Sequence, residues 1–208
     1  GRPHFATILT GGGSQLKLVS LNTDGSLQNS ISAPGVLSPV ILDDGRAIIS
    51  RRESGNQFFN SFSSDGTQFW PSELFYTSAN GSVQSNPSYD SATGSAYSAV
   101  GYDNGSIYAS VFVIPADGSA INRTVVSSAE LGSSATMVAI TPTKLLVGFD
   151  YTWSNPASGS KLFSLNKSDL TVDWSFQAEG KINQQIAVDQ AGNAYFSTQP
   201  GHLYGVDQ

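Results

Sequence analysis

The side chains that most often act as bases or nucleophiles are scarce, because the sequence has two histidines and no cysteine. His4 lies near the first residue, and His202 follows a Pro-Gly pair. No Gly-x-Ser-x-Gly motif is present, and Gly11-Gly-Gly-Ser14 lacks the lysine of a phosphate-binding loop. We therefore interpret these glycines as a hairpin turn. We predict no catalytic residue and a protein that is not an enzyme.

Carboxylates are the other source of chemistry. Asp43-Asp44-Gly45 and Asp189-Gln-Ala-Gly192 lack the alternating oxygen ligands of a calcium-binding loop. An aspartate next to a turn glycine usually accepts hydrogen bonds from nearby backbone amides. We therefore predict turns at both positions, and neither a metal site nor a cofactor.

The charge balance excludes some partners. The net charge is −6, and the basic pair Arg51-Arg52 is followed at once by Glu53. Nucleic-acid binding needs clustered basic residues, and a membrane-spanning helix needs about 20 consecutive apolar residues. The sequence has neither, so we predict no nucleic-acid partner and no membrane span.

The elements that would position a site are short β-strands. The chain has 21 glycines and only 12% charged residues, a composition poor in helix formers. A strand, a polar turn and a second strand, here termed B and C, recur along it. Four copies occupy residues 5–21, 46–62, 96–113 and 144–165, and a fifth lies within 186–207.

Two further strands accompany each B–C pair. Each C strand except the last leads through a turn, at residues 23–26, 64–67, 116–119 or 167–170, to a strand D. Three of these turns contain Asp-Gly, in which both residues readily adopt a positive φ. A strand A precedes B in the later copies, over residues 36–42, 83–89, 135–140 and 182–188.

Four-stranded units repeated about every fifty residues predict an all-β fold, a β-propeller of antiparallel blades. We expect one domain, 1–208, with about five repeats: 1–30, 31–78, 79–128, 129–179 and 180–208. The first repeat lacks strand A, and the last lacks strand D. A β-sandwich is the alternative, but it does not explain the repeated strand order.

The incomplete end repeats allow three arrangements: a five-bladed ring, a piece of a larger propeller, or a chain completed by its neighbours. Unpaired strand edges bind other strands readily. We therefore predict a protein partner, or self-assembly, at the terminal repeats. The chain begins with Gly1 and shows no signal peptide, so we expect a processed protein or part of a longer one.

Two segments carry a family resemblance. Leu165-Asn-Lys-Ser-Asp-Leu-Thr-Val-Asp-Trp174 resembles the L-D-x-x-T-G-x-x-x-W motif of pyrroloquinoline-quinone-type propeller repeats, and residues 62–70 are similar. The resemblance implies that Trp70 and Trp174 dock between neighbouring blades. Alcohol dehydrogenases of this family use adjacent cysteines and a calcium site. Because this chain has no cysteine, the resemblance points to the non-enzymatic branch.

In a propeller the B–C loops gather on one face, where ligands usually bind. The candidate ligand-face residues are Arg51, Arg52, Glu53, Asp103, Trp153 and His202. Trp153 belongs to the longest such loop and is a potential binding anchor. The alternative is a surface insertion in which Trp153 folds onto its own blade.

Four sequons, at Asn80, Asn104, Asn122 and Asn166, are candidate sites of N-glycosylation. The lack of catalytic groups and the acidic, Ser-, Thr- and Gly-rich composition favour a secreted or cell-surface protein that acts as a structural or protein-interaction scaffold. A carbohydrate-binding propeller is the second hypothesis, and a fragment of a quinoprotein dehydrogenase is the third.

Overall fold

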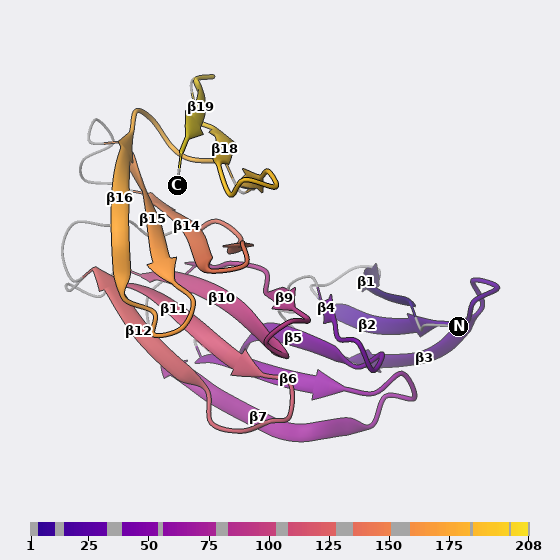
Figure 1. Ribbon diagram of the computed structural model, residues 1–208. Coiled ribbons are helices and arrows are strands. Elements are labelled where there is room, and N and C mark those ends of the chain that lie inside the picture. Colours follow the sequence, from indigo (N-terminus) through magenta and orange to yellow (C-terminus); the bar gives the residue numbers. More distant parts are fainter. Residues whose placement is uncertain are drawn as a thin grey trace. The chain divides into compact units, whose positions relative to one another are not determined.

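The computed structural model describes residues 4–10, 15–32, 39–53, 56–77, 83–102, 108–127, 135–150, 159–183, 185–199 and 201–207. Their regular structure is entirely β, with strands that form five sheets (Figure 1). The chain divides into two compact units. One comprises Gly1–Ala79, Tyr89–Ala96 and Ile114–Ile121, and the other Asn80–Ser88, Tyr97–Val113 and Asn122–Gln208.

The first unit contains a three-stranded and a four-stranded antiparallel sheet. Their strands are β1 (His4–Thr10), β2 (Gln15–Leu21), β3 (Leu27–Ser32), β4 (Val40–Ile41), β5 (Ala47–Glu53), β6 (Asn56–Phe62) and β7 (Gln68–Thr77). Ile48, Ile49 and Phe59 of the second sheet are fully buried. The Oγ of Ser20 donates to the carbonyl of Ser64, which links the two sheets.

The third sheet has the strand order β12-β11-β10-β8, and β9 also pairs with β10. Its strands are β8 (Val83–Gln84), β9 (Ser88–Asp90), β10 (Ser95–Tyr102), β11 (Tyr108–Pro115) and β12 (Asn122–Ser127).

The fourth and fifth sheets both lie in the second unit. The fourth consists of β13 (Ala139–Ile140), β14 (Lys144–Asp150), β15 (Ser160–Asn166) and β16 (Val172–Ala178), and the fifth of β17 (Ala187–Val188), β18 (Ala194–Ser197) and β19 (Leu203–Val206).

The strand order A-B-C-D is confirmed in the second and fourth sheets, where spatial order follows chain order. Within the described residues the first sheet has no strand beside β1, and the fifth has none beyond β19. The repeat boundaries themselves stay a prediction.

The A strands differ from the continuous strands that we expected. Residues 135–140 form an isolated bridge between Ala135 and Phe149, then the two-residue strand β13. Between them Thr136 donates its N–H to the carbonyl of Gly148 at 2.9 Å, and its Oγ1 accepts the N–H of Gly148 at 2.9 Å. A hydroxyl therefore replaces a backbone carbonyl in the ladder, and the A strand can bend away.

In the third sheet, too, a side-chain hydroxyl replaces a backbone carbonyl in the ladder. Ser85 donates its N–H to the carbonyl of Ala99 at 2.8 Å, and its Oγ accepts the N–H of Ala99 at 2.9 Å. Its own carbonyl accepts the hydroxyl of Ser98 instead, at 3.0 Å. A polar residue at this point of the repeat thus keeps every ladder group hydrogen-bonded where the strand breaks.

The C–D turns also differ in detail from the prediction. Gly25, Gly66 and Gly118 have φ of 83°, 86° and 79°, but none of the preceding aspartates has a positive φ. In the first turn the N–H of Gly25 donates to the carbonyl of Asn22, a turn followed by a bulged glycine. The aspartate is free to cap instead: Asp24 Oδ1 accepts the N–H of Ser26 at 2.9 Å.

The fourth C–D turn has Leu170 in the left-handed conformation, with φ of 60°. This conformation costs a non-glycine residue about 1–2 kcal/mol. The Leu170 side chain is buried in the core of the second unit. Because burying a leucine contributes about 1.5–3 kcal/mol, packing outweighs the backbone cost.

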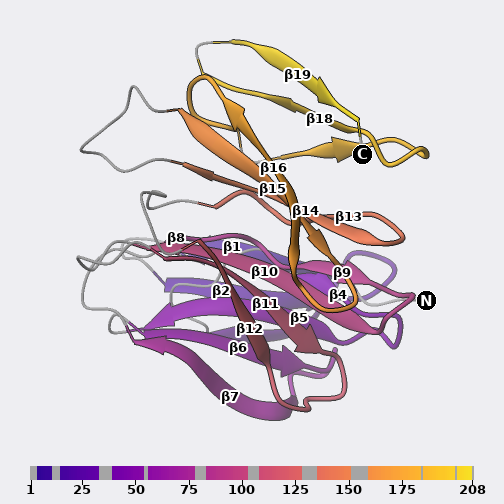
Figure 2. The ribbon, with the colours of Figure 1, turned by 60° about the vertical axis from the view of Figure 1, so that its left-hand side comes forward.

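The fourth sheet is covered on both faces (Figure 2). Leu145, Val147 and Phe149 of β14 join a cluster with residues of β10 and β11, whereas Leu146 joins a second cluster with Ala194 and Phe196 of β18. This alternation follows from the two-residue period of a strand. The fifth sheet thus packs on the face that contains Leu146.

Gly148 allows this close packing. A Cβ at this position would lie 2.9 Å from Cγ2 of Thr136 and 3.1 Å from Cδ1 of Ile182. A side chain at residue 148 would therefore push the fifth sheet, which Ile182 joins by a bridge to Thr198, away from the fourth.

The turn aspartates make stability depend on pH, and Asp169 is the test case. Its Oδ1 accepts the N–H and the hydroxyl of Thr171, at 2.9 and 2.7 Å. These bonds hold the pKa of Asp169 below its ordinary 3.8. A pKa lowered on folding adds stability above the unfolded value of about 3.9, and this stability is lost as pH falls through the folded pKa.

We expect the free energy of unfolding to fall less steeply below about pH 4 in Asp169→Asn than in the unchanged protein. The amide oxygen still accepts the N–H of Thr171, but it does not titrate. Urea denaturation at a series of acidic pH values measures the two slopes. Parallel pH dependences would contradict the prediction.

Candidate functional site

The structure describes only some of the candidate ligand-face residues. Asp103 and Trp153 lie outside the described residues. His202 lies between β18 and β19, as predicted, with an exposed ring whose Nε2 is 3.8 Å from Oε2 of Glu179. A shared ligand face therefore stays a prediction.

The placement of Arg51, Arg52 and Glu53 in a B–C loop is wrong. All three belong to β5, where they pair with Phe58, Gln57 and Asn56 of β6. The strand pairing continues past the apolar residues because backbone hydrogen bonds do not depend on side-chain polarity. Their side chains lie outside the described part of the chain.

Among the described residues of the second unit, the most exposed large apolar side chain is Leu203 of the fifth sheet. Side chains alternate along β18 and β19, so that Phe196 and Tyr204 face the fourth sheet while Tyr195 and Leu203 point the other way. Tyr195 is 43% exposed and Leu203 is 78% exposed. We call this second side of the sheet the open face.

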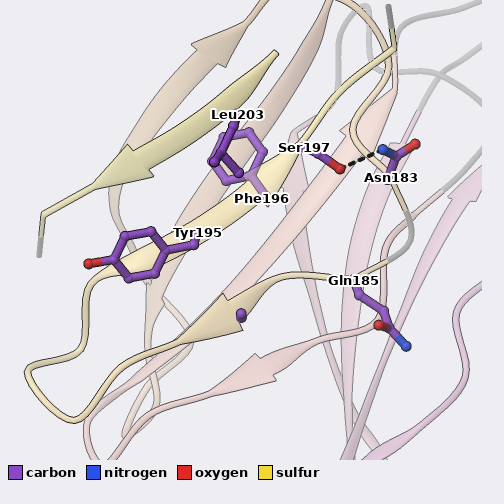
Figure 3. A pocket seen from close by; sticks show the side chains of 7 residues that line it. Asn183, Gln185, Tyr195, Phe196, Ser197 and Leu203 are labelled. Carbon is purple, nitrogen blue, oxygen red and sulfur yellow. Dashed lines mark hydrogen bonds between the residues drawn. The ribbon is translucent and has the colours of Figure 1, made fainter. Parts of the chain in front are cut away.

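A depression of about 570 Å³ lies on the open face (Figure 3). It is shallow and open to solvent. Its lining combines two aromatic residues, two aliphatic residues, two amides and a serine: Asn183, Gln185, Ala187, Tyr195, Phe196, Ser197 and Leu203. Such a mixed lining can bind another protein surface or a sugar.

Hydrogen bonds hold the polar groups of the open face. Asn183 donates its N–H to the carbonyl of Ser197 at 2.9 Å and its Nδ2 to Oγ of Ser197 at 2.6 Å (Figure 3). Tyr195 donates its hydroxyl to Oδ2 of Asp189 at 3.2 Å. This bond and the charge of Asp189 raise the pKa of the Tyr195 phenol. The face is therefore preorganised.

Aromatic contacts support the covered side of the same sheet. The rings of Phe196 and Tyr204 stack with centroids 5.2 Å apart, and Phe176 of β16 meets Tyr204 edge-on at 5.5 Å. The N–H of Glu179 donates to the hydroxyl of Tyr204 at 3.1 Å. Trp174 is half-buried against the same cluster, and its docking between neighbouring blades stays a prediction. The Trp70 side chain lies outside the described residues.

A polar network joins the fourth and fifth sheets. Ser160 donates its hydroxyl to Oδ1 of Asp150 at 2.8 Å and accepts the N–H of Ile182 at 3.0 Å. Lys181 Nζ lies 2.9 Å from Oδ2 of Asp150. Ser160 is fully buried, and its two hydrogen bonds position the start of the fifth sheet.

Two of the sequon asparagines lie within the described residues. Asn122 begins β12 and is exposed. Asn166, at the end of β15, donates Nδ2 to Oγ1 of Thr171 at 2.9 Å and accepts Nζ of Lys144 at 2.7 Å. The side-chain amide of Asn166 therefore already makes two hydrogen bonds. Asn80 and Asn104 lie outside the described residues.

Metal-ligating clusters and membrane-spanning helices are both absent from the described part of the chain. No group of three or more histidine, aspartate or glutamate side chains there could hold a metal ion. No helix there is long and apolar enough to cross a membrane.

Sequence reasoning missed the open face. Tyr195, Ser197 and Leu203 alternate with apolar residues, which was a signal for a two-sided strand. This alternation does not indicate which side of the strands the fourth sheet covers. Asn183 and Gln185 of the depression lie between the bridge at Ile182 and β17.

Comparison with known proteins identifies the fold. No family model matches the chain, and no curated protein sequence matches it. Among solved structures, the Dos1 propeller is 14% identical with a TM-score of 0.61 over 97% of this chain. The C-terminal WD40 domain of Sif2 is 10% identical with a TM-score of 0.59 over 94%. A quinohaemoprotein alcohol dehydrogenase from Pseudomonas putida is 12% identical with a TM-score of 0.65 over 97%.

The chain is thus similar to β-propellers of several kinds. It has five sheets in its described part, whereas a β-sandwich has two. The predicted propeller fold is supported, and the quinone-type subfamily stays a prediction. The chain spans 57%, 52% and 40% of the three matched chains.

The network around Ser160 leads to a stability prediction. Ser160→Ala removes the partner of both the Ile182 N–H and Asp150 Oδ1 in a buried place, so we expect the free energy of unfolding to fall by about 1–3 kcal/mol. Lys181→Met should cost less than about 1 kcal/mol, because the Lys181 side chain is 54% exposed. Chemical denaturation measures both. Equal losses in the two variants would contradict the buried-network interpretation.

Proposed function

We propose that this protein is a non-enzymatic, secreted or cell-surface β-propeller that acts as a protein-interaction scaffold and self-assembles. The open face of the fifth sheet carries the proposal. Leu203 is 78% exposed there, whereas Leu162, at the matching position of β15 in the fourth sheet, is fully buried. A leucine in such a place needs a covering surface, because burying it contributes about 1.5–3 kcal/mol.

The chemistry of the open face favours a protein partner. Tyrosine beside an aliphatic group is typical of the centre of protein interfaces. Asn183, Gln185 and Ser197 around it can satisfy the polar groups of a partner. A propeller closes its ring by covering each blade with the next, so assembly through this face also offers a way to complete the blade set.

Self-assembly is tested by removing apolar surface from the open face. We expect the unchanged chain to form assemblies in sedimentation velocity as its concentration rises, and Leu203→Asp and Tyr195→Ser to shift it toward the monomer. Val125→Asp is the matched control, because Val125 is 47% exposed but lies on β12. A monomer at every concentration, or equal effects of all three variants, would contradict the proposal.

Carbohydrate binding is the second candidate. Sugars commonly stack on an exposed aromatic ring and receive hydrogen bonds from neighbouring amides, and Tyr195 with Asn183 and Gln185 provides these groups. The self-association assay separates the two functions. Saturable binding of mono- or oligosaccharides that is lost in Tyr195→Ser, by a chain that stays monomeric, favours the carbohydrate hypothesis.

The extracellular placement leads to a glycosylation prediction. Expressed through a eukaryotic secretory pathway, the protein should carry a glycan at Asn122 in preference to Asn166. Asn122 is exposed, whereas a glycan at Asn166 requires the loss of its bond to Thr171. Glycopeptide mass spectrometry measures the occupancy, with Thr124→Val as the variant that removes the Asn122 sequon. Full occupancy of Asn166 with none at Asn122 would contradict it.

A further inference from the structure

An aromatic side chain is exposed on β7, at a position that is polar in two other repeats. Phe69 is 52% exposed. It stands four residues after the aspartate of its C–D turn, where the other repeats have Gln28, Ile121 and Asp173. Gln28 and Asp173 are exposed, and Ile121 is partly buried. The repeat therefore does not require an exposed phenylalanine at this position.

The Phe69 ring holds a guanidinium on one of its faces. The Cζ of Arg46, the residue before β5, lies 3.7 Å from the centroid of the ring. The strand registers align Arg46 with Lys144 of the fourth sheet, where Nζ of Lys144 lies 2.7 Å from Oδ2 of Asp173. An aromatic ring in the second sheet thus takes the place of the carboxylate in the fourth. The attraction between a cation and an aromatic face holds the ring in position.

Carboxylates lie close to this pair. Asp44 Oδ2 accepts Nε of Arg46 at 2.6 Å and lies 2.6 Å from Nη2. Hydrogen bonds within its own turn are the main cause that lowers the pKa of Asp117, and the charge of nearby Arg46 adds to the effect. Both aspartates and Asp43 are exposed. We call these three carboxylates, together with Arg46 and Phe69, the Phe69 surface.

A missing repeat does not explain the exposure of Phe69. At this end of the second sheet both neighbouring repeats make contact with it. On one side, the Oγ of Ser20 in β2 donates to the carbonyl of Ser64 in the C–D turn. On the other side, the hydroxyl of Tyr89 in β9 donates to Oδ2 of Asp43 at 3.2 Å. Phe69 therefore stays exposed although both adjacent repeats are in place.

We propose that the Phe69 surface is the docking site of a basic partner protein. The partner places an apolar side chain on the exposed part of the Phe69 ring, and arginine or lysine side chains beside Asp44 and Asp117. Phenylalanine and arginine are enriched in protein interfaces relative to the rest of the surface. Carboxylates around such an anchor attract cationic side chains and disfavour acidic partners. The ring thus supplies contact area, and the carboxylates determine the charge of the partner.

Charge complementarity favours this partner over other occupants. Nucleic acids and anionic membranes present phosphate groups, which the carboxylates repel. A second copy of the chain has a net charge of −6, and Arg51-Arg52 is its one pair of adjacent basic residues. The occupant is therefore a different protein. This inference rests on the proposed scaffold function, but it concerns the first unit and not the open face of the fifth sheet, so the two proposals can fail separately.

A lysine-rich peptide with one central tryptophan is the probe. We expect it to bind the 208-residue chain saturably in an NMR titration, with the amide signals of Arg46 and Phe69 among those that shift most. Binding should weaken as the salt concentration rises, because mobile ions screen opposite charges. The same peptide with glycine in place of tryptophan should bind at least about tenfold more weakly, because it cannot cover the ring. A glutamate-rich peptide with the same tryptophan should not bind.

Variants of Phe69 separate the ring from general electrostatic attraction. Phe69→Gln introduces the residue type of Gln28 and should weaken binding at least about tenfold, whereas Phe69→Tyr keeps the ring and should bind within about twofold. Leu27→Gln is the matched control, because Leu27 is 61% exposed on β3 in the same unit. It should leave binding unchanged. The melting temperature of each variant shows whether it still folds.

A second pair of variants tests the charge. Asp117→Asn keeps an acceptor for the N–H of Ser119 but removes a negative charge, so it should weaken binding by about threefold. Asp24→Asn makes the same change in the C–D turn of the first sheet and should have a smaller effect. No binding of the lysine-rich peptide, or equal effects of the two variants within either pair, would overturn the proposal. Phe69→Gln should leave self-association unchanged in sedimentation velocity. A chain that stays monomeric but binds the peptide at Phe69 contradicts only the proposed self-assembly.

Discussion

A β-sheet with two apolar faces is stable only when both faces are covered, and this requirement organises the molecule. The fourth sheet shows it most fully. β14 alternates Leu145, Val147 and Phe149 toward the third sheet's strands with Leu146 toward the fifth sheet. Removing either neighbour would expose a set of fully buried leucine, valine and phenylalanine side chains. Each such side chain contributes about 1.5–3 kcal/mol when buried, so stacking of sheets is the main source of stability.

Stacking also requires that the sheets approach closely and keep their backbone groups satisfied. Gly148 lets Ile182 approach β14, and Ser160 accepts the N–H of Ile182. Ser85 and Thr136 replace a ladder carbonyl with a hydroxyl where the A strands bend. Leu170 accepts an unfavourable φ because its side chain enters the core. Polar residues in the repeat thus serve the geometry of stacking more than any chemistry.

The same requirement explains why function is sought at the fifth sheet. In the fifth sheet only one of the two faces is covered within the described residues. Tyr204 and Phe196 are covered, whereas Tyr195 and Leu203 are not. This uncovered side is the surface on which the proposed scaffold function rests. The fold alone does not decide this, because propellers with similar folds include an alcohol dehydrogenase and a WD40 domain.

The repeat could be predicted from the sequence because its signals are local. Alternating apolar residues mark the B and C strands, and Asp-Gly pairs mark the turns between C and D; both depend on neighbours along the chain. The extension of β5 through Arg51, Arg52 and Glu53 could not be predicted from the sequence, because the length of a strand depends on its partner strand, here β6. The bends of the A strands depend likewise on hydrogen bonds to β10 and β14.

The open face shows which features of the protein the sequence determined and which the tertiary structure decided. The sequence by itself determined that residues 194–206 form two strands with two distinct sides. Only the tertiary structure decided that Phe196 and Tyr204 lie against the fourth sheet and that Tyr195 and Leu203 stay exposed. The physical reason is that both sides contain an aromatic residue, so hydrophobicity does not distinguish them. The packing of the neighbouring sheet chooses between them.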